Sequence, residues 1–178
     1  AGRGASARHL RSSLPTSGTP RAAPVVSLHP TPDPTMPDIT REQLIDLLNE
    51  DLAREYQAVI QYRTYASAVA GVYRQELREF FQAEIADELV HAQLLADKVI
   101  SLGGRPVTVP AHVKYTEDPK EMLRNSLEDE EVTVQRYVER REQAEACGEY
   151  GLAVDFDDLI RDETRHRDEL RMMLKRWT

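Results

Sequence analysis

The sequence predicts an all-α fold, an antiparallel four-helix bundle with a long crossover between the second and third helices. Four stretches of the chain carry apolar residues at steps of three and four, which is the spacing of one helix face. Residues 103–117 contain Pro106 and Pro110 and lack this period, as expected of a crossover segment. Charged residues make up 30% of the chain and only 8 residues are glycine, a composition typical of long helices.

Residues 1–36 differ in composition from residues 37–178, which we expect to form the folded domain. The segment holds six of the ten prolines and four arginines, and no acidic residue precedes Asp33. It buries too little apolar surface to offset its ordering entropy, so we expect disorder. Three interpretations stay open: an organellar transit peptide, sequence upstream of a natural start at Met36, and a tail that docks onto a partner. The expected location is cytoplasmic, or organellar if the segment is a transit peptide.

The first two helices are expected from about Thr40 to Val69 and from about Val72 to Leu102. Thr40 and Gln43 match a capping box, and Gly103-Gly104 ends the second helix. Acidic or imidazole groups interrupt both predicted inward faces. These faces comprise Leu48, Leu52, Glu55, Val59, Tyr62, Ala66 and Val69 in the first helix, and Leu77, Phe81, Glu84, Glu88, His91, Leu95 and Leu102 in the second.

The third helix is expected to begin at Pro119 after the N-cap Asp118, with Glu121 completing a second capping box, and to end near Cys147-Gly148. The fourth is expected from near Tyr150 almost to the end of the chain. Both inward faces again contain Glu or His. They comprise Leu123, Leu127, Glu130, Val134, Tyr137 and Ala144 in the third helix, and Leu152, Phe156, Leu159, Glu163, His166, Leu170, Met173 and Trp177 in the fourth.

One pattern occurs twice in the chain, at an offset of 75 residues. The motif D-E-x-x-H appears at residues 87–91 and again at 162–166. The same offset relates Glu55 to Glu130 and Tyr62 to Tyr137. Residues i and i+3 share a helix face, so each Glu and His of the motif project in one direction. Four such helices place four carboxylates and two imidazoles in one core.

Such a core calls for positive charge, because burying four carboxylates without compensation costs many kcal/mol. Two divalent ions balance the four negative charges, and carboxylate with imidazole suits iron or manganese. We assign Glu55 and His91 to one ion and Glu130 and His166 to the other, with bridging carboxylates from the two motif glutamates, Glu88 and Glu163. The alternative is a structural bundle with a metal-free polar core.

Several neighbouring residues have weaker claims to a role at the site. Asp87 and Asp162 either hydrogen-bond the opposite histidine or make an inter-helix contact without a metal role. Tyr62 and Tyr137 are expected to be core aromatics whose hydroxyls bond buried carboxylates. Glu84 is a candidate ligand on the entry path, or a rim residue. The groups expected to face solvent or to be inert are Glu128, Glu131 and Cys147, although a shifted helix phase would bring Glu131 into the site.

Charge and cysteine content exclude other classes of partner. A net charge of −8 argues against nucleic acid, which requires a basic face, and suits attraction of cations. A single cysteine excludes an intrachain disulfide and a thiolate-rich metal site. No apolar run reaches the roughly 20 residues of a membrane helix. We therefore expect neither nucleic acid nor a membrane as partner.

Four passages carry a family resemblance: EYQAVIQY (55–62), DELVHA (87–92), EMLR (121–124) and LIRDETRH (159–166). With the two motif copies, they resemble the ferritin-like diiron carboxylate proteins, and within them bacterioferritin, over roughly residues 39–174. The resemblance implies a ferritin-like bundle and a ferroxidase centre that oxidises Fe(II) with O2 or H2O2, for iron storage or detoxification. The implied ligands are Glu55, Glu88, His91, Glu130, Glu163 and His166. The runner-up is a rubrerythrin-like peroxide reductase, for which Glu131 would supply an additional carboxylate.

Two departures from bacterioferritin change what the resemblance implies. Leu89 stands where bacterioferritin has the Met that binds haem, so we expect no haem. Only twelve residues follow His166, where bacterioferritin has a longer fourth helix and a short fifth. The expected assembly is a homo-oligomer, with a dimer and a cage both left open.

Overall fold

A computed structural model of the chain describes residues 39–175 and 177. These residues form α1 (Arg41–Ala68), α2 (Arg74–Ser101), α3 (Pro119–Ala146) and α4 (Tyr150–Leu174), and the described part of the chain contains no strand. The predicted all-α four-helix fold is therefore confirmed. The expected disorder of residues 1–36 lies outside the described residues, so the domain boundary stays a prediction.

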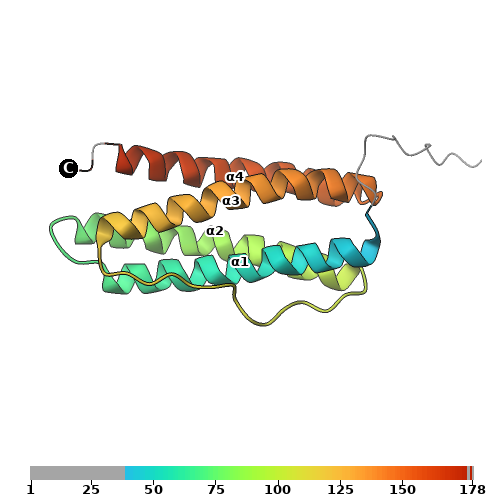
Figure 1. Ribbon diagram of the computed structural model, residues 1–178, viewed down its shortest axis with the longest axis horizontal. Coiled ribbons are helices and arrows are strands. Elements are labelled where there is room, and N and C mark those ends of the chain that lie inside the picture. Colours follow the sequence, from blue (N-terminus) through green and yellow to red (C-terminus); the bar gives the residue numbers. More distant parts are fainter. Residues whose placement is uncertain (1–38, 176, 178) are drawn as a thin grey trace, which may run out of the picture. The chain divides into compact units, whose positions relative to one another are not determined.

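The four helices form two antiparallel pairs, α1 with α2 and α3 with α4 (Figure 1). Short turns join the helices within each pair, and the long segment between α2 and α3 runs along α1. Backbone and side-chain hydrogen bonds fix this crossover on α1. Ala111 donates its N–H to the carbonyl of Ala53 at 2.7 Å, and the Asn49 amide donates to the carbonyl of Arg105 at 3.1 Å. The crossover predicted from the two prolines is thus confirmed.

The start of α1 and the start of α2 follow from local chemistry. Thr40 caps α1, and both bonds of the predicted capping box with Gln43 are present. The sequence predicts a start of α2 near Val72, and the helix starts two residues later because Gly71 has φ +94° and forms a turn in which the Arg74 N–H bonds the Gly71 carbonyl. Helix α2 therefore begins at Arg74.

The start of α3 corrects one predicted detail. Asp118 is the N-cap and accepts a hydrogen bond from the backbone N–H of Lys120, and Pro119 occupies the first helical position as expected. The second capping box is not formed. The Glu121 carboxylate instead accepts from the Thr116 hydroxyl at 2.5 Å, and the Asp118 N–H donates to the same Thr116 oxygen. Thr116 thus takes the place that Glu121 was predicted to fill.

The interior divides into two apolar clusters, one toward each end of the bundle. One contains residues from the first half of α1, the second half of α2, the second half of α3 and the first half of α4; the other contains the opposite halves. The buried charged residues of the two motifs lie at chain positions between these clusters. A polar layer therefore lies between the two apolar clusters of the bundle. Within the described residues, no helix is both long and apolar enough to cross a bilayer.

Candidate metal centre

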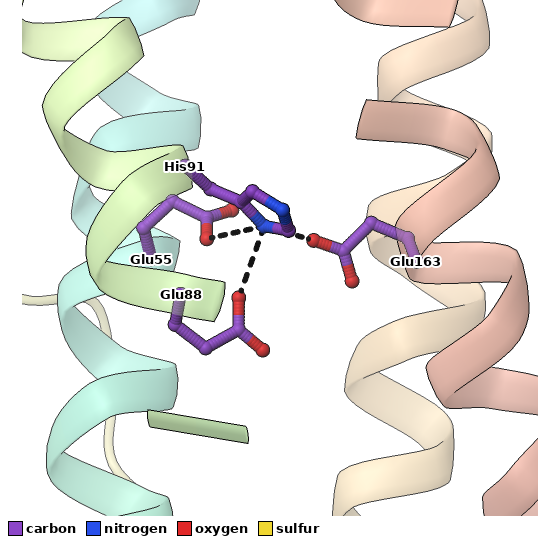
Figure 2. Close-up of side chains that lie close together, drawn as sticks. All are labelled: Glu55, Glu88, His91 and Glu163. Carbon is purple, nitrogen blue, oxygen red and sulfur yellow. Dashed lines mark ion pairs between the residues drawn. The ribbon is translucent and has the colours of Figure 1, made fainter. Parts of the chain in front are cut away.

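The six ligands expected from the sequence meet in the polar layer. All six side chains are buried, with exposed fractions of 4% or less. Helices α1 and α3 each contribute one glutamate, and α2 and α4 each contribute a Glu-x-x-His pair. Figure 2 shows Glu55 and Glu88 approaching His91 from one side while Glu163 points toward it from α4. The arrangement follows from helical phase, because each of the six residues occupies a position on an inward face where an apolar residue is expected.

One half of the centre is built around His91. Its Nδ1 lies 2.8 Å from Glu163 Oε1, 3.3 Å from Glu88 Oε2 and 3.7 Å from Glu55 Oε2. These four residues each offer a ligand atom within 4.8 Å of the others. We call Glu55 and His91, with Glu88 and Glu163, the His91 half-site.

The other half is built around His166. Its Nδ1 lies 3.6 Å from Glu163 Oε2 and 3.9 Å from Glu88 Oε1, and Glu130 joins the same set of atoms within 4.8 Å. We call Glu130 and His166, with Glu88 and Glu163, the His166 half-site. Glu88 and Glu163 belong to both half-sites, which is the geometry that bridging carboxylates require.

The centre contains buried polar atoms that no protein group satisfies. They are Glu55 Oε2, His91 Nδ1, both carboxylate oxygens of Glu163, and His166 Nδ1. The short contact between His91 Nδ1 and Glu163 is not aligned as a hydrogen bond. Buried polar atoms without partners are rare, and these five converge from different helices. Carboxylate oxygens and imidazole nitrogens are donor atoms for divalent cations, so the residues present fit a pair of such ions.

The electrostatics of the carboxylates indicate where positive charge is needed. Burial raises the pKa of Glu55, Glu88 and Glu130, and the negative charge of Glu163 raises each pKa further. Burial also acts to raise the pKa of Glu163, but the neighbouring Glu130 carboxyl and the two histidines stabilise its charged form and outweigh burial, so the net shift of that pKa is downward. Without a cation, the site therefore favours protonation of the surrounding glutamates over four buried charges.

The histidines respond in the opposite sense. Burial alone lowers the pKa of His91, yet the carboxylates of Glu163, Glu55 and Glu88 outweigh it and raise that pKa. His166 shows the same balance, with Glu163 and Glu84 as the main groups that raise its pKa. Both imidazoles therefore stand in a strongly negative field, and a bound cation would replace the proton on Nδ1.

Two tyrosines connect the repeats crosswise. Tyr62 on α1 donates to Glu130 on α3 at 2.5 Å, and Tyr137 on α3 donates to Glu55 on α1. Both side chains are almost fully buried. Each hydroxyl therefore fixes one carboxylate oxygen of Glu55 or Glu130, the two glutamates that belong to a single half-site. The second oxygen of that carboxylate is left toward the centre. The sequence predicted a buried carboxylate partner for both hydroxyls, and the structure confirms both bonds.

The motif aspartates face the opposite histidines, but unequally. Asp87 Oδ2 lies 3.3 Å from His166 Nε2 and also accepts from Arg165 at 2.9 Å. Asp162 Oδ2 is 3.9 Å from His91 Nε2, beyond hydrogen-bond distance. A hydrogen bond on Nε2 leaves Nδ1 as the atom that can bind a metal. Only the Asp87 pair makes that bond here.

The remaining candidates lie at or outside the rim. Glu84 is partly buried on α2, and its Oε2 is 3.4 Å from His166 Nδ1. Glu131 is exposed and pairs with Arg171 at 2.6 Å, so the alternative in which Glu131 joins the site is wrong. Glu128 is exposed as expected and pairs with Lys114. Leu89 is 53% exposed on α2.

Sequence reasoning missed a buried ion pair one turn from the centre. Asp51 and Arg140 are almost fully buried, and the Arg140 Nε donates to Asp51 Oδ2 at 2.6 Å. Helical spacing places both residues on inward faces, because Asp51 lies four residues before Glu55 and Arg140 lies three residues after Tyr137. The pair joins α1 to α3 beside the Tyr137–Glu55 bond.

Sequence reasoning also missed a polar cavity on the α1–α3 side of the centre. It measures about 20 Å³, about enough for a water molecule, and reaches Glu55, Glu88, Glu130 and Glu163. At its edge, Gln61 on α1 donates to Asp129 on α3 at 2.8 Å, and Lys114 of the crossover donates to the same carboxylate at 2.8 Å. Glutamines and aspartates on helices are usually exposed, so the sequence alone does not indicate these partners.

Comparison with known proteins agrees with the geometry. The family model of the ferritin-like domain matches residues 45–178. A bacterioferritin from Streptomyces coelicolor is 29% identical over 133 residues, which is 74% of this chain and 80% of the relative. A bacterioferritin from Desulfovibrio desulfuricans is 25% identical over 127 residues, 71% of each chain.

Solved structures show the same fold. A ferritin-like, diiron-carboxylate protein from Bacillus anthracis superposes with a TM-score of 0.74 at 47% identity, covering 75% of this chain and 96% of that one. The Desulfovibrio desulfuricans bacterioferritin, solved with its diiron site in different catalytic states, superposes with a TM-score of 0.69 at 21% identity, covering 76% and 80%. The match over most of the chain, together with the four-helix fold, shows that this protein belongs to the ferritin-like family, close to the bacterioferritins.

Proposed function

We propose that the protein is a diiron ferroxidase that oxidises Fe(II) to Fe(III) with O2 or H2O2 and so serves iron storage or detoxification. The observation that carries the proposal is the pair of half-sites that share Glu88 and Glu163. The proposed ligands are Glu55 and His91 for one ion, Glu130 and His166 for the other, and Glu88 and Glu163 as bridges. Four carboxylates match the charge of two divalent ions.

The relatives support iron as the substrate. The Bacillus anthracis neighbour is a diiron-carboxylate protein at 47% identity, and the sequence relatives are bacterioferritins. Manganese suits the same donor atoms and is the alternative metal. A homo-oligomer, either a dimer or a cage, stays a prediction for this chain.

The residues of the chain have separable tasks in this proposal. A pair of iron ions held by the six residues would supply the two electrons that reduce the oxidant. Burial of all six ligands keeps bulk water out. Tyr62 and Tyr137 hold the outer oxygens of Glu130 and Glu55, and Asp87 fixes the His166 ring through Nε2. These contacts keep the ligand atoms turned inward before the metal arrives.

Anaerobic Fe(II) titration of chelator-treated protein, followed by a pulse of O2, tests the proposal. We expect saturation near two Fe(II) per chain and a fast rise in near-ultraviolet absorbance. The double variant Glu88→Ala/His91→Ala should lose both. No stoichiometric binding by the wild type, or equal behaviour of the variant, would leave the metal-free structural bundle as the better description.

The oxidant separates the ferroxidase from the rubrerythrin-like peroxide reductase. Because Glu131 faces away from the site, the structure gives no specific support to the second function. Parallel reactions with O2 and with H2O2 distinguish the two. Consumption of O2 with continued Fe(II) turnover into soluble mineral supports the ferroxidase, whereas peroxide consumption that outpaces O2 consumption without mineral supports the reductase.

A further inference from the structure

The two repeats differ at one inward position next to the centre. The offset that relates all six ligands pairs Glu84 on α2 with Leu159 on α4. Leu159 is 3% exposed and packs in an apolar cluster beside the His91 half-site. Glu84 therefore places a carboxylate where the symmetry of the repeat would place a leucine. As a result, only one of the two half-sites has an additional carboxylate beside it.

Contacts of Glu84 show which half-site it serves. Its Oε2 lies 3.4 Å from His166 Nδ1, closer than either shared glutamate comes to that nitrogen. Both Glu84 Oε2 and His166 Nδ1 are buried without a hydrogen-bond partner. The His166 imidazole is 3% exposed and the Glu84 side chain is 13% exposed, so Glu84 lies between the solvent-exposed rim and the buried centre.

We propose that Glu84 is an additional carboxylate ligand of the His166 half-site, so that this half-site binds the first divalent cation and the His91 half-site binds the second. The inference rests on the proposed diiron function. Three carboxylates reach the His91 half-site, whereas four reach the His166 half-site once Glu84 is included. Affinity for a hard cation rises with the number of carboxylate ligands, so the two binding steps are unequal.

Titration with Co(II) of the chelator-treated full-length chain tests the order of binding. Visible absorption reports cobalt coordination, and calorimetry reports affinity, without any turnover. The wild type should bind two Co(II) per chain in two steps. In Glu84→Gln, the first step should weaken at least about tenfold with a change in the cobalt spectrum, while the second step keeps its affinity. In Glu55→Gln, the second step should weaken and the first should remain.

A matched control separates ligation from general charge. Glu79→Gln removes the same charge from an exposed position on the same helix and should titrate like the wild type. If Glu84→Gln titrates like the wild type, or weakens both steps equally, the inference is overturned while the diiron function stands. If the wild type and Glu88→Ala/His91→Ala both bind no Co(II), the proposed function fails and the inference falls with it.

Discussion

At the scale of single residues, the hydroxyls of Tyr62 and Tyr137 fix the positions of the Glu130 and Glu55 carboxylates. Each is buried and donates to a carboxylate of the other repeat. We expect Tyr62→Phe and Tyr137→Phe each to lower the free energy of unfolding of the metal-free protein by about 1–3 kcal/mol, because a buried carboxylate loses its donor. Urea denaturation after chelator treatment measures the change.

A third tyrosine provides the control for those variants. Tyr65 accepts a hydrogen bond from the Asn125 amide, and among the described residues no carboxylate is hydrogen-bonded to its hydroxyl. Tyr65→Phe should therefore cost less than either of the other two substitutions. Equal losses in all three variants would show that the hydroxyls act through general packing, and the proposed positioning of Glu55 and Glu130 would be wrong.

At the scale of secondary-structure elements, the buried ion pair between Asp51 and Arg140 joins α1 to α3. Both side chains are almost fully buried, and Arg136 adds a second contact to Asp51 at 2.7 Å. Asp51→Asn leaves the buried Arg140 guanidinium without its carboxylate, which costs about 3–5 kcal/mol. Arg140→Met should cost less, because Arg136 still pairs with Asp51. Urea denaturation should show this loss, and the double variant Asp51→Leu/Arg140→Met should recover most of it.

An exposed pair gives the comparison for this prediction. Arg141 on α3 contacts Asp157 on α4 at 2.8 Å, and both side chains are partly or largely exposed. Asp157→Asn should leave stability unchanged, because solvent screens exposed pairs. A double Asp51/Arg140 variant that is no more stable than the single variants would mean that the buried pair is itself stabilising rather than merely costly to break.

The elements that the sequence predicts well are those with a repeated pattern. Glu55 and Glu130 stand out because each interrupts an apolar face at the same offset as the two D-E-x-x-H motifs. Asp51 and Arg140 have no counterpart in that repeat, and their partnership depends on how α1 meets α3. Helix phase fixes which side of a helix a residue faces, but the pairing of two particular charges across helices is a tertiary property.

The same distinction explains the smaller errors. The Thr40–Gln43 capping box depends on four consecutive residues and forms as expected. Glu121 matches the same pattern before α3, but the crossover brings the Thr116 hydroxyl to both Glu121 and the Asp118 N–H. A capping motif read from sequence assumes that no competing donor or acceptor arrives from the preceding loop. Here Thr116 is such a competitor.

At the scale of the whole molecule, the polar layer divides one interior into two apolar clusters. Each cluster contributes stability by burying apolar surface, whereas the metal-free layer between them holds unpartnered polar atoms. Binding of two cations to the folded state alone should raise the midpoint of thermal unfolding as their concentration rises. Calorimetry with Co(II) or Mn(II) measures this, and Glu88→Ala/His91→Ala should show no rise.

Acidity should act in opposite directions on the metal-free and metal-loaded protein. In the metal-free fold the pKa values of Glu55, Glu88 and Glu130 lie above their ordinary value of 4.5, and that of His91 lies above 6.5. The folded state therefore binds more protons than the unfolded state above pH 4.5, so its stability should fall as pH rises toward neutrality. Glu163, whose pKa is lowered, opposes this trend only below that pH.

The metal-loaded protein should instead lose stability on acidification, because protons compete with the cations for the same ligand atoms. Urea denaturation between about pH 5 and 8 measures both slopes, with about 1.4 kcal/mol per pH unit expected for each proton taken up. Glu130→Gln removes one of the groups whose pKa is raised, so its metal-free slope should be shallower than that of the wild type. Equal slopes in the variant and the wild type would mean that surface charges, not the buried centre, set the pH dependence of this bundle.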